Sequence, residues 1–284
     1  MMRFAVIGHP VAHSLSPAMH AANFASLGLD AEYSKFDVEP GDVAAFVRER
    51  RDEGYVGLNV TVPHKKAVLA LLDAPDESVR RYGSCNTLKF EADGTISGSN
   101  TDVAGFLSCL SAHGVALSGA RVLVVGCGGA GSALAKACVL ERAAAVSVSA
   151  RTFATARELA VSLAELAEIE TTGTSAAAVP AADVGALYAA ACAADVIVNA
   201  TPVGLQPGDG SVVPAGAFRK GQFVLDIIPT RELPPTAAAA LAAGASAAGG
   251  LEFLVEQGAR SFEIWTGLKA DRSAMLAAVG ACAR

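Results

Sequence analysis

A glycine-rich segment in the middle of the chain has the residue spacing that binds dinucleotides. Gly126, Gly128 and Gly131 fit the pattern G-x-G-x-x-G between a predicted apolar strand and a predicted helix. In such a loop the first glycine permits a tight turn, the second lets the backbone approach the pyrophosphate, and the third allows close packing of helix on strand. Free N–H groups at the start of the helix then bind the phosphates. The sequence therefore predicts a dinucleotide site, rather than a turn without a ligand, at Gly126, Cys127, Gly128, Gly129, Ala130 and Gly131.

The end of the next predicted strand indicates which dinucleotide is bound. NAD sites place an Asp or Glu there, about 20 residues after the glycines, to hold the ribose hydroxyls. This chain instead has Ala150, Arg151 and Thr152, with Arg157 soon after and no acidic residue before Glu158. An arginine stacks on adenine and binds a 2′-phosphate, which a carboxylate would repel. These residues predict NADP as the cofactor, with NAD and a merely solvated Arg151 as the alternatives.

Polar residues also gather in four short segments of the first hundred residues. Each segment lies near a predicted strand end or helix start, where the ligands of α/β sheets bind. Taken singly, each has a structural explanation: Ser16 could cap a helix, and Lys65 could be a solvated helix residue. Together with the glycine motif they indicate a substrate site. The segments are 14–17, 59–65, 85–87 and 100–102.

The elements that must position these residues follow an α/β pattern in two halves. In the first half, apolar strands are predicted at 4–8, 31–36 and 56–60, helices at 16–27, 42–51 and 65–72, and a hairpin at 86–98 around Asp93-Gly94. Alternating strands and helices of this kind predict an α/β substrate domain with a largely parallel sheet. After a helix at 105–113, the pattern restarts at residue 120.

The second half predicts a doubly wound, Rossmann-type dinucleotide-binding domain. Its strands are expected at 121–126, 145–149, 196–199 and 223–227, and its helices at 132–141 and 155–168. The tail, 251–284, holds two helical patterns and no strand, so we expect it to return to the first domain for a surface to pack on. The predicted domains are residues 1–103 for substrate binding and catalysis, 104–249 for NADP, and the C-terminal helices at 250–284.

Composition excludes several other classes of protein. Among 284 residues, 52% are hydrophobic and 18% charged, which supplies packed cores and little disorder. The mean hydropathy of +0.41 could suggest a membrane protein, but no apolar run approaches the roughly 20 residues of a spanning helix. A net charge of −6 without a basic cluster argues against nucleic acid.

The compartment and the partners are expectations from the same composition. The N-terminus lacks the pattern of a signal peptide, and the six cysteines are far apart with no C-x-x-C pair. They predict reduced thiols in a cytoplasmic protein. We expect a small-molecule substrate, no membrane, and a monomer or homodimer.

The combination of motifs resembles the shikimate dehydrogenase family, and the resemblance covers nearly the whole chain. Two further segments carry it, Asn199–Gly204 after a predicted strand and Phe253–Phe262 in the tail. The resemblance implies reversible reduction of 3-dehydroshikimate to shikimate by NADPH, a step toward chorismate and the aromatic amino acids.

The resemblance also implies which residues bind the substrate and the cofactor. Ser14 and Ser16 match the serines that bind the substrate carboxylate, a task suited to hydroxyl donors because they add no charge. The substrate ring hydroxyls would be held by Asn59, Thr61, Asn86 and Gln257. Further cofactor contacts are implied at Thr201, Ile227 and Gly250.

Lys65 and Asp102 match the catalytic pair of the family. Hydride delivery to a ketone builds negative charge on oxygen, and that oxygen must acquire a proton. A lysine ammonium beside a carboxylate can stabilise the alkoxide and pass the proton. In the reverse direction Lys65 would act as the base, with Asp102 holding it. No metal is required, and the histidines have no zinc-ligand spacing.

Three positions depart from the family pattern and leave alternatives open. Ala150 replaces an asparagine, Pro229 stands where a tyrosine is usual, and Phe253 replaces a methionine. A relative that acts on quinate or an aminoshikimate-like acid, with NADP or NAD, is therefore the first alternative. A non-catalytic nucleotide-binding regulatory module is the second, although Lys65 and Asp102 are both present.

Overall fold

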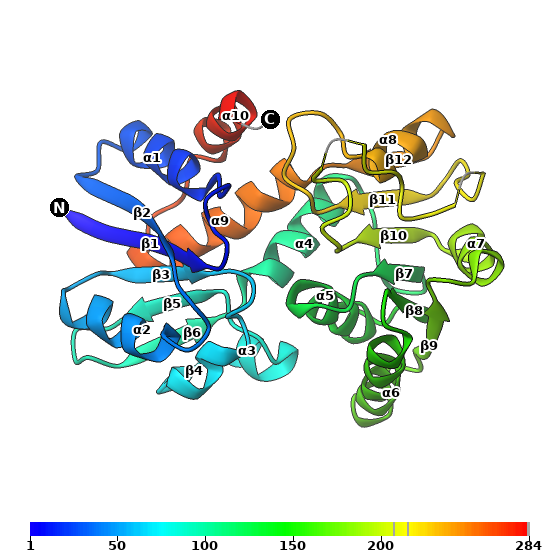
Figure 1. Ribbon diagram of the computed structural model, residues 1–284, viewed down its shortest axis with the longest axis horizontal. Coiled ribbons are helices and arrows are strands. Elements are labelled where there is room, and N and C mark those ends of the chain that lie inside the picture. The colour runs from blue at the N-terminus through cyan, green and yellow to red at the C-terminus, as the bar shows by residue number, and fades with distance from the viewer. Residues whose placement is uncertain (207, 215, 283–284) are drawn as a thin grey trace. The chain divides into compact units, whose positions relative to one another are not determined.

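The chain divides into two structural units, one of which is built from both of its ends. The computed structural model describes residues 1–206, 208–214 and 216–282. Of the described residues, unit 1 consists of Met1–Phe106 and 254–282, and unit 2 of Leu107–Phe253 (Figure 1). Each unit contains one six-stranded sheet, so each sheet can position its own set of functional residues.

The sheet of unit 1 is mixed, with strand order β2-β1-β3-β5-β6-β4. Three of its five pairings are parallel, and the two antiparallel ones involve β5, which forms the predicted hairpin with β6. Gly94 in the hairpin turn has φ +85°, a conformation that favours glycine. The strands are β1 (Met2–Gly8), β2 (Ala31–Asp37), β3 (Gly57–Val60), β4 (Ala74–Pro75), β5 (Thr87–Phe90) and β6 (Ile96–Ser99).

The helices of unit 1 differ from the prediction at one functional position. Residues 65–72 form a turn and a short 3-10 helix, η1, rather than an α-helix. The reason is that the Lys65 carbonyl accepts the Cys85 N–H at 2.9 Å, so it is used outside a helix. The other helices are α1 (Ser16–Ser26), α2 (Val43–Asp52), α3 (Glu77–Tyr82) and α10 (Arg272–Cys282), and η1 covers Ala67–Leu71. Unit 1 also contains the first half of α4 (Thr101–Ala112) and most of α9 (Gly250–Thr266).

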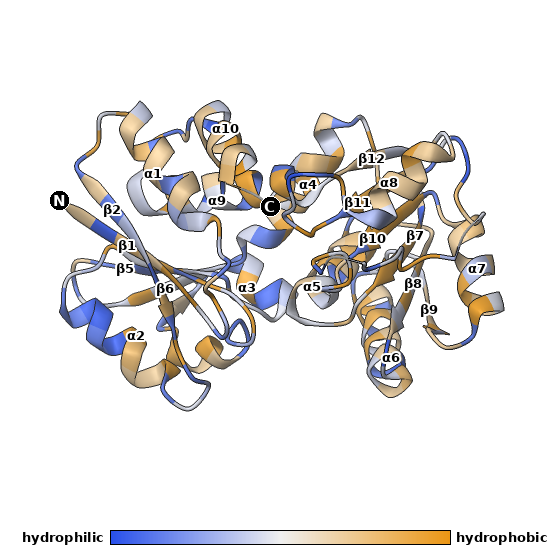
Figure 2. Cartoon of the chain, turned by 45° about the horizontal axis from the view of Figure 1, so that its top comes forward, coloured by the Kyte–Doolittle hydropathy of each residue, from blue (hydrophilic) through white to orange (hydrophobic). Residues whose placement is uncertain are grey.

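The C-terminal helices pack on unit 1, as predicted. Phe262 and Trp265 of α9 share a core cluster with Phe4 and Phe24. The Trp265 indole N–H also donates to the Leu88 carbonyl of β5 at 2.8 Å. Residues 283 and 284 of the predicted tail lie outside the described residues. The helix that covers the other side of the unit, α2, buries Val43 and Val47, while its charged C-terminal half is hydrophilic in Figure 2.

Unit 2 is the predicted doubly wound fold. Its six strands are all parallel in the order β12-β11-β10-β7-β8-β9. Strands β8 and β9 are added on one side of β7 and strands β10 to β12 on the other, so the strand order reverses between β7 and β10. Ligands of such sheets bind at this switch point, beyond the carboxyl ends of the strands. The strands are β7 (Arg121–Val125), β8 (Ala145–Ala150), β9 (Ser175–Pro180), β10 (Val196–Asn199), β11 (Phe223–Asp226) and β12 (Ser246–Ala248).

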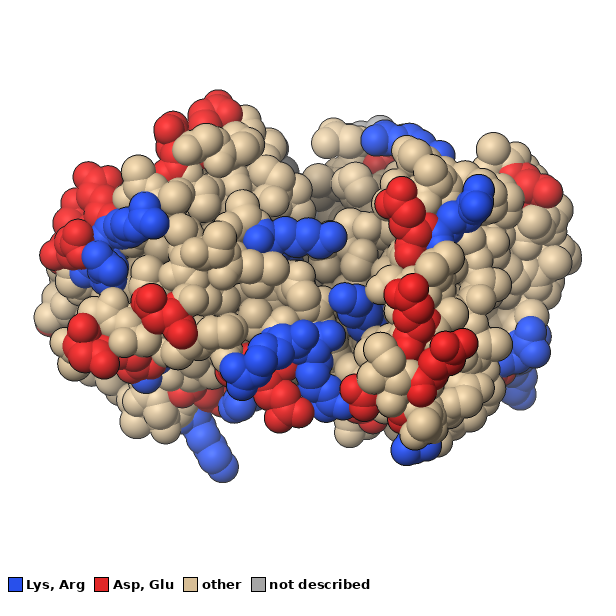
Figure 3. All heavy atoms as spheres, turned by 90° about the horizontal axis from the view of Figure 1, so that it is seen from below, with Lys and Arg blue, Asp and Glu red and all other residues tan. Residues whose placement is uncertain are grey.

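Four helices of unit 2 connect these strands, and Figure 1 shows α5 next to β7 and β8. They are α5 (Gly129–Leu140), α6 (Phe153–Ile169), α7 (Val184–Ala193) and α8 (Pro235–Ala242). Every residue of β10 and β11 is buried, as expected for strands covered on both faces. None of the described helices is both long and apolar enough to cross a membrane. On the face drawn in Figure 3, lysines and arginines lie among aspartates and glutamates.

Candidate functional site

Lys65 and Asp102 form a short ion pair in unit 1. The Lys65 Nζ donates to Asp102 Oδ2 at 2.5 Å, and only 13% and 4% of the two side chains are exposed. Asp102 lies in the first turn of α4, while Lys65 lies in the turn after β3. The fold thus brings together two oppositely charged groups that the sequence separates by 37 residues. A shielded ammonium beside a carboxylate can stabilise developing negative charge and exchange a proton.

Asn86 holds the other oxygen of the same carboxylate. Its Nδ2 donates to Asp102 Oδ1 at 2.9 Å and to Thr101 Oγ1 at 2.9 Å, and lies 3.3 Å from Gln257 Oε1. Its Oδ1 accepts the Thr101 N–H at 2.7 Å, which fixes the amide orientation. Asp102 is therefore bonded on Oδ2 by Lys65 and on Oδ1 by Asn86. The carboxylate has little freedom to turn away from the lysine.

Asn59 is buried behind Asn86, with all of its hydrogen-bonding groups used within unit 1. Its Nδ2 has acceptors at the Asn86 carbonyl (3.1 Å), Thr87 Oγ1 (3.3 Å) and Ser261 Oγ (2.9 Å). Its Oδ1 accepts the hydroxyl hydrogen of Tyr33 at 2.7 Å. In this structure Asn59 supports Asn86, and the role that the family resemblance implies for it, holding a substrate hydroxyl, stays a prediction.

The two serines and Thr61 lie where β1 and β3 end. The loop after β1 leads to Ser14 and Ser16, and the Ser16 N–H donates to Ser14 Oγ at 3.3 Å. Thr61 directly follows β3 and its N–H donates to the Ile7 carbonyl of β1 at 2.8 Å. The parallel pairing of β1 with β3 thus places the start of the loop after β1 and Thr61 at the same end of the sheet. In the described part of the chain, neither Ser14 nor Thr61 has a side-chain hydrogen bond to the Asn86 network.

Four residues of this network were not singled out from the sequence. Thr87 and Thr101 lie inside the polar segments, and Ser261 lies one helical turn after Gln257, so the spacing i, i+4 was an available signal. The three hydroxyls contact one another, with Oγ–Oγ distances of 2.8, 3.1 and 3.2 Å. Tyr33 is a single residue in β2 with no motif around it, and only its partners in space reveal it.

The glycine loop of unit 2 has the shape of a pyrophosphate site. A Cβ on Gly131 would lie 1.8 Å from the Gly126 carbonyl oxygen, and Gly126 itself has φ +108°. A Cβ on Gly128, by contrast, would meet nothing within 4 Å. The first and third glycines are therefore required by packing, whereas the second borders open space. No side chain caps the start of α5 at Gly129, so its backbone N–H groups are available to an anion.

The remaining residues of the glycine loop contribute backbone rather than charge. Cys127 is half-buried, its thiol lies 3.7 Å from the Ser149 carbonyl, and burial raises the pKa of that thiol to about 11. The thiol is therefore protonated at neutral pH. Ala130 lies in the first turn of α5. A neutral, glycine-rich loop on a helix N-terminus fits a dinucleotide pyrophosphate.

Two free arginines follow β8. Arg151 comes directly after Ala150, the last residue of the strand, and Thr152 is the N-cap residue of α6. Arg151 and Arg157 are exposed, and no carboxylate of the described residues lies within ion-pair distance of either guanidinium. Both cations are thus available to a phosphate at the end of β8, where the sequence predicts the adenosine ribose.

A buried carboxylate–amide pair organises the ends of β10 and β11. Both oxygens of Asp226 lie 3.0 Å from the Asn199 amide nitrogen. Asn199 Oδ1 in turn accepts the Thr201 N–H at 3.0 Å and its hydroxyl at 2.7 Å. Burial raises the pKa of Asp226 to about 6, against the opposing effect of the hydrogen bond from Asn199. The pair orients Thr201, and the Asn199 carbonyl accepts the N–H of Ile227 at 3.1 Å.

The last predicted cofactor residue, Gly250, is required by close packing. A Cβ there would lie 2.3 Å from the carbonyl carbon of Ile228, so a side chain is excluded. Two of the three departures from the family pattern are neighbours of this contact in the sequence: Pro229 follows Ile228 and is half-buried, and Phe253 lies three residues after Gly250 and is buried. The structure thus collects the predicted substrate and catalytic residues in unit 1 and the predicted cofactor residues in unit 2.

Comparisons with known proteins agree with this arrangement. Residues 6–88 match the model of the shikimate dehydrogenase substrate binding domain, and residues 250–279 match that of the shikimate 5′-dehydrogenase C-terminal domain. The chain is 44% identical over 282 residues to a shikimate dehydrogenase (NADP(+)) of Anaeromyxobacter sp. (strain Fw109-5), covering 99% of this chain and 96% of that relative.

Solved structures extend the comparison. The shikimate 5-dehydrogenase of Thermus thermophilus, in complex with NADP(H) and shikimate, has a TM-score of 0.83 and 40% identity, and the match covers 98% of each chain. A quinate dehydrogenase of Corynebacterium glutamicum in complex with NAD has a TM-score of 0.85 and 29% identity, again over 98% of each chain.

Proposed function

The chain belongs to the shikimate dehydrogenase family, and on that premise we propose which of its residues bind shikimate and NADP and carry out the reaction. The activity itself is the NADP-dependent interconversion of shikimate and 3-dehydroshikimate, a step of the shikimate pathway. The observation that carries the proposal is the Lys65–Asp102 ion pair at 2.5 Å, in which the carboxylate also accepts a hydrogen bond from Asn86.

Lys65 is the proposed acid–base residue. NADPH, when bound, supplies the hydride to the substrate carbonyl. The Lys65 ammonium stabilises the negative charge that develops on that oxygen and donates a proton from Nζ. Asp102 keeps Lys65 oriented through Oδ2, while the bond from Asn86 to Oδ1 keeps the carboxylate in place. In the oxidation of shikimate, Lys65 in its neutral form accepts the hydroxyl proton.

The proposed substrate contacts lie around this pair. Ser14 and Ser16 donate their hydroxyls to the substrate carboxylate, and the loop that follows β1 positions them. Thr61, Asn86 and Gln257 recognise the ring hydroxyls. Asn86 and Gln257 are supported by their bonding to each other and to the catalytic carboxylate. Asn59 takes part through Asn86, because its own amide is already bonded within the protein.

The proposed cofactor site follows the ends of the unit 2 strands. Gly126–Gly131 bind the pyrophosphate, and Arg151 and Arg157 bind the 2′-phosphate of NADP, because both guanidinium groups lack an ion-pair partner among the described residues. Thr152 and Ala150 border the adenosine ribose. Thr201, Ile227 and Gly250 are proposed to contact the nicotinamide half, where the ends of β10 and β11 support them.

An activity with quinate is the second candidate. It is favoured by Pro229 and Phe253 in place of a tyrosine and a methionine, and by the similarity to the quinate dehydrogenase of C. glutamicum. The serine at position 16 favours shikimate. We also propose that the protein acts in the cytoplasm, since its six cysteines are all free thiols. A monomer or homodimer is proposed as its oligomeric state.

Initial rates with shikimate and quinate, each with NADP⁺ and NAD⁺, separate these candidates. We expect strong preference for shikimate with NADP⁺, measured by the absorbance of the reduced nicotinamide. A preference for quinate would instead make Pro229 and Phe253 markers of a different ring selectivity. A preference for NAD⁺ would remove the proposed role of Arg151.

A further inference from the structure

Tyr33 is a buried residue of β2 whose one polar side-chain atom contacts two parts of the substrate site. Its hydroxyl donates to Asn59 Oδ1 at 2.7 Å, and a hydrogen bond from Ser16 partly offsets the effect of burial, which raises the pKa of Tyr33. Ser16 belongs to the proposed carboxylate-binding loop, and Asn59 supports Asn86. Tyr33 therefore connects the side of the site that binds the carboxylate to the side that holds the catalytic pair.

The bond from Tyr33 satisfies the Asn59 amide oxygen in the orientation that the Asn86 carbonyl, which can only accept, imposes on the amide. An amide has one acceptor oxygen and one donor nitrogen, and exchanging them reverses every contact. Burial raises the pKa of Tyr33, so the hydroxyl is protonated at neutral pH and donates to Oδ1. The amide nitrogen faces the Asn86 carbonyl and Ser261 Oγ. Without that donor, Oδ1 would be a buried acceptor without a partner.

The ring of Tyr33 is held by aromatic packing. The His20 imidazole stacks on it with centroids 4.3 Å apart and planes 9° apart, and Trp265 lies at 6.3 Å. Burial lowers the pKa of His20 to about 3, so the stacked imidazole is neutral. His20 lies four residues after Ser16 on α1, one helical turn away. The stack thus fixes the phenol relative to the turn of helix that carries Ser16.

We propose that Tyr33 is a positioning residue for substrate binding, which holds the Ser16 hydroxyl and the Asn59 amide in their binding arrangement without touching the reacting atoms. The inference rests on the proposed function of Ser16 and Asn86. It assigns a role to a residue that the polar segments of the sequence do not include.

Tyr33→Phe tests the role, because it keeps the stacked ring and removes the hydroxyl. Because the substrate-binding groups lose the partner that holds them in position, we expect the KM for shikimate to rise about tenfold. We expect kcat to stay within about twofold and the KM for NADP⁺ to be unchanged, since neither the Lys65–Asp102 pair nor unit 2 is altered. Thermal unfolding of the variant, followed by circular dichroism, checks that the packing is retained.

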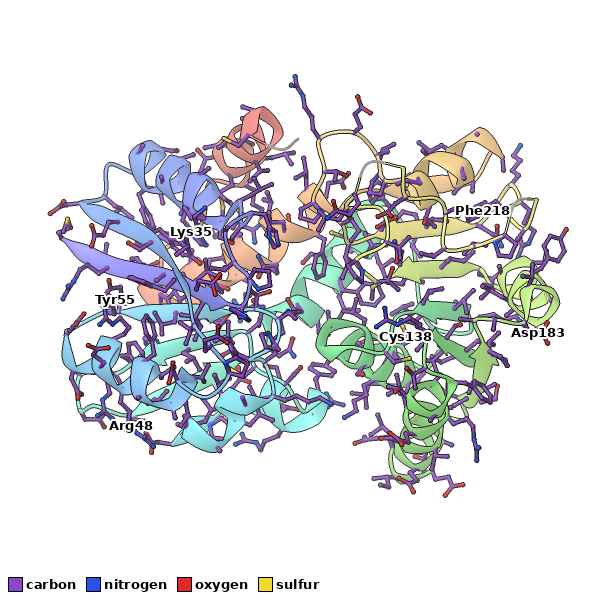
Figure 4. All side chains as sticks on the ribbon, viewed as in Figure 1. Lys35, Arg48, Tyr55, Cys138, Asp183 and Phe218 are labelled. Carbon is purple, nitrogen blue, oxygen red and sulfur yellow. The ribbon has the colours of Figure 1, made fainter. Side chains whose placement is uncertain are left out.

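The matched control is Tyr55→Phe in the same unit. Tyr55, labelled in Figure 4, is similarly buried, but its ring lies against the guanidinium groups of Arg3 and Arg50, at 4.8 and 5.6 Å. We expect the loss of this hydroxyl to leave the KM for shikimate unchanged. An equal rise in KM for both variants would mean a general effect on unit 1 and would overturn the proposal.

A double-mutant cycle of Ser16→Ala and Tyr33→Phe tests the connection itself. If Tyr33 acts through Ser16, the double variant loses less than the product of the two single losses in kcat/KM. Fully multiplicative losses would overturn the connection, and so would a fall in kcat with KM unchanged. The parent enzyme is assayed first: failure to oxidise shikimate would contradict the proposed function, whereas an active parent with an unaffected Tyr33→Phe variant contradicts this inference alone.

Discussion

The catalytic proposal depends on how two charged residues are kept charged and in place inside unit 1. Removing an ammonium and a carboxylate from water is unfavourable unless each finds a partner. Here the Lys65 ammonium and the Asp102 carboxylate are paired with each other at 2.5 Å, and Asn86 donates a hydrogen bond to the second carboxylate oxygen. The amide of Asn86 is held in turn by Thr101. Orientation is thus built into the resting protein, so no reorganisation is needed when charge develops on the substrate.

Lys65→Ala should act mainly on turnover. The amine works on charge and protons that appear in the transition state, so we expect kcat to fall about a hundredfold or more with a much smaller change in the KM for shikimate. Steady-state kinetics at saturating NADP⁺ measure both constants. The control is Lys66→Ala, an exposed neighbour. A change in KM alone, with kcat intact, would refute the acid–base role.

Arg151→Ala should change the choice of cofactor. Its guanidinium has no carboxylate partner among the described residues, so the bond it loses is the one to the 2′-phosphate. We expect the KM for NADPH to rise about tenfold to a hundredfold while that for NADH changes little. Arg48→Ala, an exposed arginine of unit 1, is the control. An equal rise in the KM for NADPH and for NADH would show that Arg151 does not bind the 2′-phosphate.

At the scale of elements, the parts of the fold with strong local patterns could be predicted. Strands β7, β10 and β11 are runs of β-branched and aliphatic residues, and the glycine motif located the start of α5. Strand β9 and helix α7 were not predicted, because SAAAVP and VGALYAAACA are rich in alanine and carry neither a clear period nor strong propensity. The helix expected at 65–72 failed for a tertiary reason, since the Lys65 carbonyl bonds to Cys85.

The candidate site was predictable to the extent that its residues lie in motifs. Lys65, Asn86 and Asp102 belong to short polar segments, and the structure brings them into contact. Tyr33 could not be found this way, because its partners Asn59 and Ser16 come together only through the pairing of β1 with β2 and β3. The saturation of the Asn59 amide is likewise a property of packing.

Alanine substitutions in the glycine loop separate the glycine required for stability from the glycine required for NADP binding. Gly131→Ala places a Cβ against the Gly126 carbonyl and should destabilise the protein even without cofactor, by about 2 kcal/mol or more. Gly128→Ala places its Cβ in open space, so we expect little change in Tm but much weaker NADP binding. Thermal unfolding and calorimetric titration with NADP⁺ measure the two effects. A Gly128→Ala variant that binds NADP⁺ normally would place the pyrophosphate elsewhere.

On the scale of the whole molecule, the two units should respond to acid in opposite directions. In the unfolded chain His20 binds a proton below pH 6.5, whereas in the folded protein burial lowers its pKa to about 3. The free energy of unfolding therefore decreases as the pH falls below 6.5. Burial raises the pKa of Asp226 in unit 2 to about 6, so its buried carboxylate destabilises the fold above that pH. This destabilisation is relieved as the pH falls from about 6 toward 3.8 and the carboxyl group is protonated in the folded protein.

His20→Phe isolates the first of these effects. Phenylalanine keeps an aromatic ring against Tyr33 and removes the titration, so the variant should lose less stability than the parent between pH 7 and pH 5. The difference expected at pH 5 is about 2 kcal/mol, from a proton bound only by the unfolded state. Denaturant unfolding at pH 7 and pH 5 measures this difference in the free energy of unfolding. The contribution of Asp226 cancels in the comparison, because the parent and the variant both contain this residue. His13→Phe, at an exposed histidine, should behave like the parent, and a His20→Phe variant with the parent's acid sensitivity would contradict the assignment.

Unit 1 is assembled from two segments that unit 2 separates in the chain, so its core can be completed only after residues 107–253 have been synthesised. Residues 107–253 leave the ribosome as one uninterrupted stretch and carry every strand of the second sheet. The first sheet is made earlier, yet the aromatic core around Phe4 and Phe24 must wait for Phe262 and Trp265. Gln257 and Ser261 arrive with that same helix. A nascent chain can therefore acquire its dinucleotide fold before its catalytic network, and the network closes only when the helix that finishes the core is in place.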